Sequence, residues 1–379
     1  MSDVAILMMV KNESESMKVS LESTKRYFDT IIVFDTGSTD NTVDIIQKTC
    51  KDNKQTLHLK QGEFKSFPES RNEAIEFAEK SSSNSIKFFL LMDAGDEFKT
   101  DMTPFEFQKM FKSIPPNNSF DIGIIKQKWL DDKGKGNISD HFDCRLIKNH
   151  KQIRYDLRYP VHEQVCNADT LVSSNFGDHF YLYQDRIKYG GSTKNRYQRD
   201  IEMLLKAHPN KRNLYFLAQS FMSIDDYKNG YKYNVLSYQC KDKSNNDDIF
   251  TLVRIAFCAM QIKMIPIAIK YLEILLEMDE PPVDAYVYML DIHIKNNQCD
   301  KVIKYVKKLY NLKKPSPTSS IKLINHHFYD YLRFNLISIV CLMSNEELEI
   351  GKKACLKAIA FNRPDDLHNI QIYQKLIIV

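Results

Sequence analysis

Three runs of the sequence decide the fold: VAILMMVKNE (4–13), TIIVFDTGSTDNT (30–42) and KFFLLMDAGDEF (87–98). Each begins with a short apolar stretch, and each ends in polar residues. A fourth run, TLHLK (56–60), is of similar length, and the segments between the runs have helical periodicity, as at 14–28. Short apolar runs that alternate with helices are typical of βαβ units. The sequence therefore predicts an α/β domain with a mostly parallel sheet.

Polar clusters follow three of the predicted strands. They are Lys11-Asn12-Glu13, the stretch from Asp35 to Ser38, and the stretch from Asp93 to Glu97. In open α/β sheets ligands bind at the carboxyl ends of the strands, so these clusters predict one binding site.

The cluster that begins at Asp35 offers hydroxyl groups, backbone N–H groups and a carboxylate in one turn. It contains one glycine and no lysine, unlike a P-loop, and the GxGxxG fingerprint is absent. The turn therefore favours a ribose or a base edge, and it argues against ATPase and hydride-transfer functions.

The cluster that begins at Asp93 contains three carboxylates directly after an apolar strand. Hard divalent cations such as Mg²⁺ and Mn²⁺ take carboxylate oxygens, and such a cation could neutralise a diphosphate leaving group. The alternative is a solvated turn without a ligand.

Beyond residue 100 the pattern changes twice. Strand-like runs at 122–130, 143–148 and 153–157 predict an antiparallel completion of the first domain, and helical periodicity dominates from about 193. In the helical part, small residues recur twelve apart, at Ala218 and Gly230 and again at Ala256 and Ala268. This spacing is typical of tetratricopeptide-like helix hairpins. We therefore predict two domains, residues 1–190 and 191–379.

Composition excludes several classes of protein. Among 379 residues, 53 Lys and Arg face 49 Asp and Glu, an excess too small to predict binding to nucleic acid. The eight cysteines include no Cys-x-x-Cys pair, which argues against a zinc site or a disulfide scaffold. We expect a soluble, cytoplasmic protein, because the sequence shows no signal peptide and no apolar run of membrane-spanning length. Nine of the eleven glycines lie at or before Gly191, which predicts that the first half carries the site.

Four motifs together resemble the family 2 glycosyltransferases, which have the GT-A nucleotide-sugar fold. They are ILMMVKNE (6–13), VFDTGSTDNT (33–42), SRNEAIEFA (70–78) and LLMDAGDEF (90–98). Four later motifs resemble a subgroup in which such a domain is fused to tetratricopeptide-like helices: RLIKN (145–149), YPVHEQV (159–165), KNRYQRD (194–200) and NLYFLAQSF (213–221).

The resemblance implies roles for individual residues in binding the donor nucleotide. The implied nucleotide-binding residues are Val10, Asn12, Glu13, Asp35, Thr36, Ser38, Arg71 and Asp93, with Lys194, Arg196 and Arg199 closing over the diphosphate. A solvated first helical turn is the alternative for the last three.

The resemblance also implies Mn²⁺ or Mg²⁺ as a cofactor. The family usually has Asp-x-Asp at this point, whereas this chain has Gly95 in place of the second carboxylate. We therefore expect Asp93 and Asp96 to bind the metal, with His162 as a later ligand.

The catalytic base of an inverting transfer is a carboxylate that accepts the acceptor's proton. Glu163, next to His162, is the candidate, with Asp143 and Asp140 in reserve. The alternative for the His-Glu pair is a hydrogen-bonded strand end.

The resemblance thus implies a hexosyltransferase-type enzyme. It would move a sugar from a nucleoside diphosphate, with UDP expected, to an acceptor hydroxyl or side chain on a protein or glycan. Helical repeats present concave surfaces, so the second domain could hold the acceptor or form a homodimer. A non-catalytic scaffold with a degenerate sugar-nucleotide domain is the alternative. A nucleotidyltransferase is disfavoured, because Lys11-Asn12-Glu13 lacks glycine.

Overall fold

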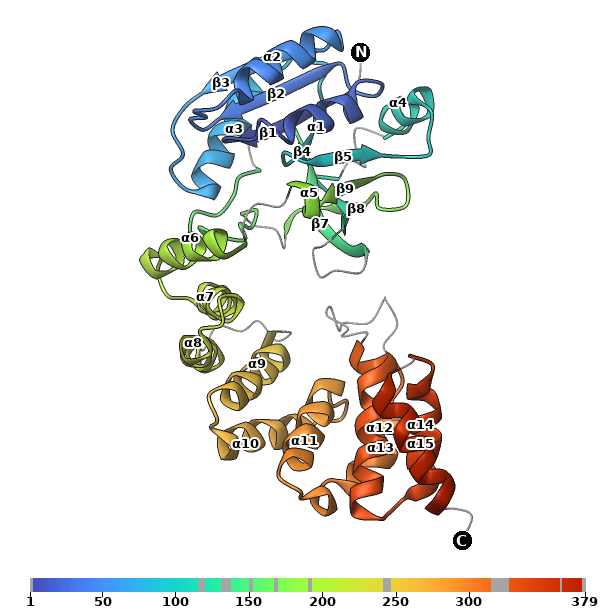
Figure 1. The fold of residues 1–379 in the computed structure, drawn as a ribbon. Coiled ribbons are helices and arrows are strands. Elements are labelled where there is room, and N and C mark those ends of the chain that lie inside the picture. Colours follow the sequence, from blue (N-terminus) through green and yellow to red (C-terminus); the bar gives the residue numbers. More distant parts are fainter. Residues whose placement is uncertain are drawn as a thin grey trace. The chain divides into compact units, whose positions relative to one another are not determined.

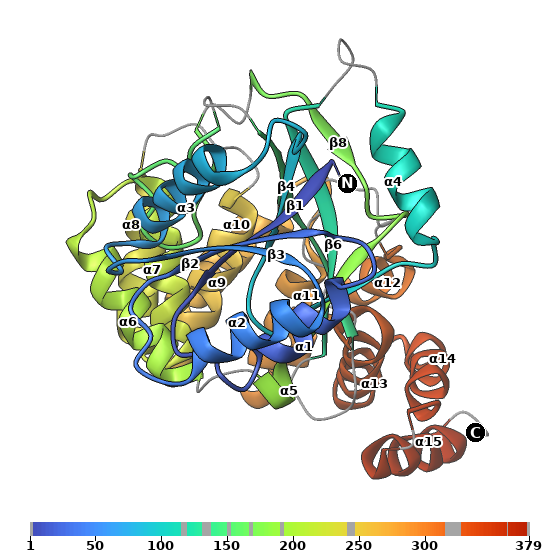
Figure 2. The ribbon, with the colours of Figure 1, turned by 90° about the horizontal axis from the view of Figure 1, so that it is seen from above.

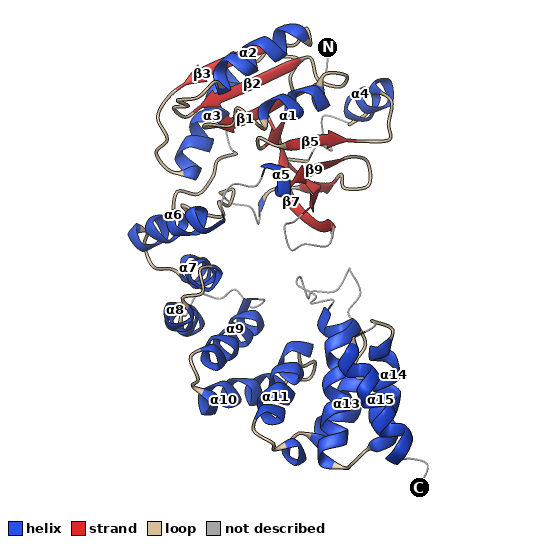
Figure 3. Cartoon of the chain, in the orientation of Figure 1, coloured by secondary structure: helices blue, strands red, loops and turns tan. Residues whose placement is uncertain are grey.

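The computed structural model divides the chain into two compact units, Met1–His208 and Pro209–Val379. It describes residues 3–114, 120–130, 138–149, 153–166, 170–189, 193–240, 247–314, 327–361 and 363–376, and only the backbone of 138–140, 193, 194 and 247. The first unit is α/β and the second is helical (Figures 1 and 3), which confirms the predicted fold class. The sequence places the division at 190/191, whereas helix α6 (Thr193–Lys206) belongs to the first unit of the structure.

One sheet organises the first unit, in the strand order β3-β2-β1-β4-β7-β6-β9-β5, with β8 beside β6. The strands are β1 (Val4–Val10), β2 (Thr30–Asp35), β3 (Thr56–Gln61), β4 (Phe88–Met92), β5 (Asp96–Lys99), β6 (Ile122–Leu130), β7 (Ile138–Lys148), β8 (Ser173–Asn175) and β9 (Tyr181–Asp185). The strands β1 to β4 are parallel, as predicted, and β7 pairs antiparallel with β4. Because β6 and β9 run parallel to β4, all three end at the edge that carries the polar clusters.

Alternating side chains build a core on each face of the sheet. Ile6 and Met8 of β1 pack in one cluster with α1 (Met17–Thr24), α2 (Thr42–Asp52) and α4 (Pro104–Lys112). Ala5 and Leu7 pack in the other cluster with α3 (Phe67–Ser81). Figure 2 shows α3 on one side of the parallel strands and α1 and α2 on the other. A strand buried on both faces must be apolar at every position, which explains the continuous apolar runs of the sequence.

The connection from β4 to β5 forces the sheet to curl. Only Asp93, Ala94 and Gly95 join the two strands, although three other strands separate them in the sheet. Four inter-strand spacings cover about 19 Å in a flat sheet. Four Cα–Cα steps reach at most about 14 Å. The sheet must therefore bend until β5 approaches the carboxyl end of β4.

The predicted strands at 4–10, 30–35 and 122–130 have the bounds of β1, β2 and β6. The prediction of a strand at 153–157 is wrong, because this segment makes only one isolated bridge, between Tyr155 and Val165. Its side chains instead cover the α3 face of the sheet, where Ile153 and Tyr155 are buried.

Helices make up the second unit. They are α7 (Lys211–Ser223), α8 (Tyr227–Gln239), α9 (Asp247–Gln261), α10 (Ile265–Leu276), α11 (Val283–Lys295), α12 (Ile303–Asn311), α13 (Arg333–Ser344), α14 (Leu348–Ile359) and α15 (Pro364–Leu376). From α7 to α11 each helix packs against the next. Gly230 allows α7 and α8 to approach closely, because a Cβ there would lie 2.8 Å from Met222 Cγ. The assignment to tetratricopeptide repeats stays a prediction. Within the described ranges, no helix combines the length and the apolar character that a membrane crossing requires.

Candidate functional site

The loops after β1 and β2 are joined by hydrogen bonds through Asn12 and Ser38. Asn12 has a φ of +56°, so its backbone N–H reaches Ser38 Oγ at 2.9 Å, and its side-chain oxygen accepts from Thr39 N at 2.7 Å. Asp35 accepts from the Ser38 hydroxyl. Two of the predicted nucleotide-binding segments therefore form one rigid surface at the edge of the sheet.

Three predicted nucleotide contacts are buried within this surface. Val10, Asp35 and Thr36 are each at most 2% exposed, and the Val10 carbonyl accepts both the N–H and the hydroxyl of Thr36. Their described contacts are within the protein, so they shape the loop. Asn12 and Ser38 lie nearer the surface.

Glu13 lies at the inner end of the same surface. Its Oε2 accepts the Ser16 hydroxyl at 2.6 Å. Burial raises the pKa of Glu13, and the charges of Asp93 and Asp40 raise it further, against the Ser16 hydrogen bond. Its backbone N–H donates to Thr42 Oγ1 at 2.7 Å, which connects Glu13 to the first residue of α2.

Two arginines hold Asp93. Arg145 on β7 donates from Nη1 to Asp93 Oδ2 at 2.8 Å, and Arg71 on α3 donates from Nη2 to Oδ1 at 3.4 Å. Burial alone would raise the pKa of Asp93, but Arg145 and Arg71 outweigh it and hold the pKa well below its ordinary value. Asp93 is therefore a carboxylate at neutral pH.

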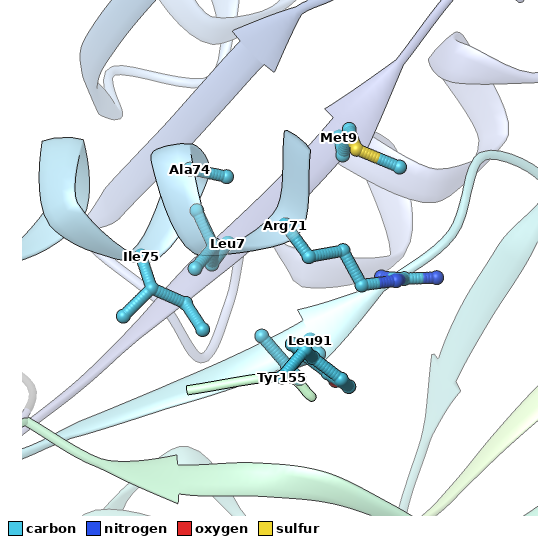
Figure 4. Close-up of a pocket in the computed structure, with 7 residues that line it drawn as sticks. All are labelled: Leu7, Met9, Arg71, Ala74, Ile75, Leu91 and Tyr155. Carbon is cyan, nitrogen blue, oxygen red and sulfur yellow. The ribbon is translucent and has the colours of Figure 1, made fainter. Parts of the chain in front are cut away.

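Arg71 also pairs with the predicted base. Its Nε donates to Glu163 Oε1 at 2.6 Å, and both side chains are mostly buried, at 18% and 14% exposure. Figure 4 shows the Arg71 side chain extending between Met9 and the pair Leu91 and Tyr155, which line a small pocket with it. This apolar lining packs around the Arg71 side chain, whose guanidinium contacts both the Asp93 and the Glu163 carboxylates.

Asp143, one of the two reserve bases, pairs with Arg145, which also holds Asp93. Asp143 is 58% exposed, and its Oδ2 lies 3.3 Å from Arg145 Nε. Asp140 lies on β7, but its side chain is outside the described residues. Of the two candidates whose side chains are described, Glu163 contacts Arg71 and Asp143 contacts Arg145.

The structure does not bring the three predicted metal ligands together. Asp96 is 1% exposed, and its Oδ2 accepts the Asp93 backbone N–H at 2.9 Å. Burial, and then the charge of Asp93, raise the pKa of Asp96 to about 7. His162 is exposed, with a φ of +53°. In the described part of the chain no three His, Cys, Asp or Glu side chains form a cluster that could hold a metal, so these residues do not fit the predicted cation.

The predicted diphosphate residues lie on α6. The Lys194 side chain is outside the described residues. The Arg199 guanidinium lies 5.2 Å from the centroid of the Phe67 ring on α3, and Arg196 Nε is 3.9 Å from Asp200 Oδ2. The start of α6 is therefore placed beside α3, which carries Arg71.

Sequence reasoning missed Arg145 and Arg186 as site residues. Arg145 belongs to the motif RLIKN, but the spacing of that motif indicates no charge partner. Arg186 follows β9, a strand that the sequence pattern did not reveal. A strand and its partners must be known before such a residue can be placed at the site.

Comparison with known proteins supports the reading of the first unit. Residues 5–128 match the family model described as "Glycosyl transferase family 2". The match confirms the resemblance for this segment, which covers β1 to most of β6.

Two curated relatives are the SPbeta prophage-derived glycosyltransferase SunS of Bacillus subtilis (strain 168) and the glycosyltransferase SunS of Bacillus phage SPbeta. Each is 24% identical over 260 residues, which is 67% of this chain. The chain spans 57% of the length of these relatives.

Among solved structures, S. aureus TarS is similar over 70% of this chain and 54% of its own, with a TM-score of 0.41 and 14% identity. TarS 1–349 in complex with UDP is similar over 69% and 82%, with a TM-score of 0.36 and 15% identity.

Proposed function

We propose that this chain transfers a hexose from a nucleoside diphosphate, UDP first among those to test, to a hydroxyl or side chain of a protein or glycan. The main observation behind this proposal is that Arg71 contacts both Asp93 and Glu163 at the carboxyl edge of the sheet. The family match over residues 5–128 supports the reaction class.

The reaction we propose is a single displacement with inversion. The acceptor oxygen forms a bond to the anomeric carbon and gives its proton to the Glu163 carboxylate. The bond from that carbon to the diphosphate oxygen breaks, and the nucleoside diphosphate leaves with the electron pair.

Glu163 can act as a base only if the acceptor reaches its carboxylate. Arg71 Nε donates to Oε1, and among the described residues no hydrogen bond to Oε2 is found. We propose that Oε2 accepts the proton of the acceptor hydroxyl and that Arg71 keeps the Glu163 carboxylate in place. In this assignment Oε2 faces the acceptor, while Oε1 stays hydrogen-bonded to Arg71.

The predicted Mn²⁺ or Mg²⁺ stays a prediction, and we assign no step to it, because its predicted ligands do not converge. The acceptor site and a homodimer through the helical unit also stay predictions. The rival function, a non-catalytic scaffold, makes a different prediction about nucleotide binding.

The test is a binding panel of UDP-glucose, UDP-galactose, UDP-GlcNAc and GDP-mannose, followed by donor hydrolysis with the ligand that binds. Glu163→Gln should retain binding and lose roughly 10²- to 10⁴-fold in hydrolysis. Glu22→Gln, the matched control at a solvent-accessible carboxylate of α1 that pairs with Lys25, should keep near-normal hydrolysis. Binding of no donor would favour the scaffold.

A further inference from the structure

Arg186 is a partly buried guanidinium at the edge of the candidate site. It opens α5 (Arg186–Tyr189), directly after β9. Its Nε donates to Gln184 Oε1 at 2.9 Å. Among the described residues no carboxylate forms an ion pair with it, whereas Arg71 and Arg145 both pair with Asp93. A partly buried cation in this state is suited to an anionic ligand.

Aromatic stacking holds Arg186 in place. Its guanidinium carbon lies 3.4 Å from the centroid of a Trp129 ring, and Trp129 stacks in turn on His141, with ring centroids 3.7 Å apart. Trp129 is the only tryptophan of the chain. Stacking on an aromatic ring leaves the edge of a guanidinium available for hydrogen bonds in its plane.

The strand register places Arg186 beside the Asp93 loop. Gln184, two residues earlier, pairs with Asp96 on β5 and with Trp129 on β6. A Cβ at Gly95 would lie 3.4 Å from Tyr189 Cβ and 3.8 Å from Gln184 Nε2, so the loop after β4 lies beside the end of β9 and α5.

Guanidinium groups, and not a set of metal ligands, lie at this edge. Both oxygens of Asp93 face guanidinium groups, Asp96 turns inward, and position 95 is a glycine. Arg186 and the exposed Arg196 remain on the side of the site where α5 and α6 begin. A diphosphate needs compensating charge, which guanidinium groups can supply with directed hydrogen bonds.

We propose that Arg186 binds the diphosphate of the sugar donor, and that guanidinium groups supply the compensating charge there without a divalent cation. This inference rests on the proposed function, since it names the residue that would bind the donor's leaving group.

The test is calorimetric binding of uridine, UMP and UDP, each in EDTA and in Mn²⁺. Wild-type protein should bind UDP with equal affinity in both conditions. Arg186→Gln should weaken UDP binding roughly 10- to 100-fold, as expected for the loss of a charged hydrogen bond, and leave uridine binding unchanged. The UDP affinity of Arg186→Lys should lie between those of the wild type and Arg186→Gln. Lys188→Gln, which removes a positive charge two residues away on the same helix, is the matched control and should bind UDP normally.

The outcomes separate this inference from the proposed function. The inference alone is overturned if uridine binds but UDP binding requires Mn²⁺. It is also overturned if uridine binds and Arg186→Gln binds UDP as tightly as the wild type. Failure of uridine, UMP and UDP to bind overturns the proposed UDP donor and the inference with it. Retained uridine binding by Arg186→Gln also shows that the variant is folded, so loss of UDP binding then reports on the diphosphate.

Discussion

Arg71 Nε donates to Glu163 Oε1 at 2.6 Å, joining residues that are 92 positions apart in the chain. The pair connects the first turns of α3 to the segment that contains the predicted base. Both side chains are mostly buried, so the interaction is only weakly screened by solvent. The position of Glu163 therefore depends on Arg71.

Arg71→Gln should destabilise the first unit by about 2–4 kcal/mol, because it leaves the mostly buried Glu163 carboxylate without its cation and leaves Asp93 with Arg145 alone. Urea denaturation followed by tryptophan fluorescence measures this change. The double variant Arg71→Gln/Glu163→Gln should be less destabilised than the sum of its single variants. Additive effects would show that the ion pair does not couple the two residues. Arg158→Gln is the control, since the Arg158 side chain is 73% exposed in its pair with Asp156 and solvent screens that pair, so the loss of stability should be much smaller.

Asp96→Asn should change how stability depends on pH. The pKa of Asp96 is raised from 3.8 to about 7, so between these values the folded protein binds a proton that the unfolded chain releases. The contribution of Asp96 to stability is complete below about pH 4 and is lost as the pH rises through about 7. Asparagine does not titrate, so the variant should gain stability relative to the wild type over this window. Chemical denaturation at several pH values measures the difference, and a constant difference would contradict the raised pKa.

Asn12→Ala should weaken the hydrogen-bonded connection between the loops that follow β1 and β2. Alanine loses the hydrogen bond to Thr39 N and is strained at a φ of +56°, which together cost about 2 kcal/mol. Asn12→Gly removes the same side chain but accepts this φ, so it should be the less destabilised variant. Thermal melting compares the two. Equal melting temperatures would mean that the backbone conformation at residue 12 carries no cost.

Gly351→Ala should disrupt the packing of α14 against α15. A Cβ at position 351 would overlap the Tyr373 hydroxyl and lie 2.6 Å from Cys341 Cβ, so we expect a loss of about 1–3 kcal/mol. The Tyr373 hydroxyl donates to the Ser338 carbonyl at 2.6 Å and cannot move freely. Tyr373→Phe in the same chain should therefore recover part of the lost stability. Circular dichroism during melting follows the effect, and Gly351→Ala with unchanged melting would contradict the close packing.

The sequence was sufficient to predict the parallel part of the sheet, because strands buried on both faces leave uninterrupted apolar runs such as 4–10. It was not sufficient for β5, β8 and β9. The β8 strand is three polar residues, SSN (173–175), and β9 has mixed character, YLYQD (181–185). Such edge segments become strands through their partners, not through an intrinsic pattern.

The candidate site was predictable to a similar extent. Arg71, Asp93 and Glu163 each stand in a recognisable motif, and the structure brings all three into contact. Their ion pairs could not be read from spacing, because they depend on where distant elements meet. The inward orientation of Asp96 has the same origin: β5 pairs with β9, and the Asp96 carboxyl group accepts the backbone N–H of Asp93.

The three-residue connection between β4 and β5 acts as a tether on the curvature of the sheet. Asp93 begins this connection and Asp96 follows it, and two hydrogen bonds close the turn between them: Asp96 N donates to Asp93 O at 3.1 Å, and Asp93 N donates to Asp96 Oδ2 at 2.9 Å. A change in the antiparallel strands, at a distance from any ligand, would alter the bend and pull on this tether. The closed turn therefore limits how far the sheet can flatten between β4 and β5.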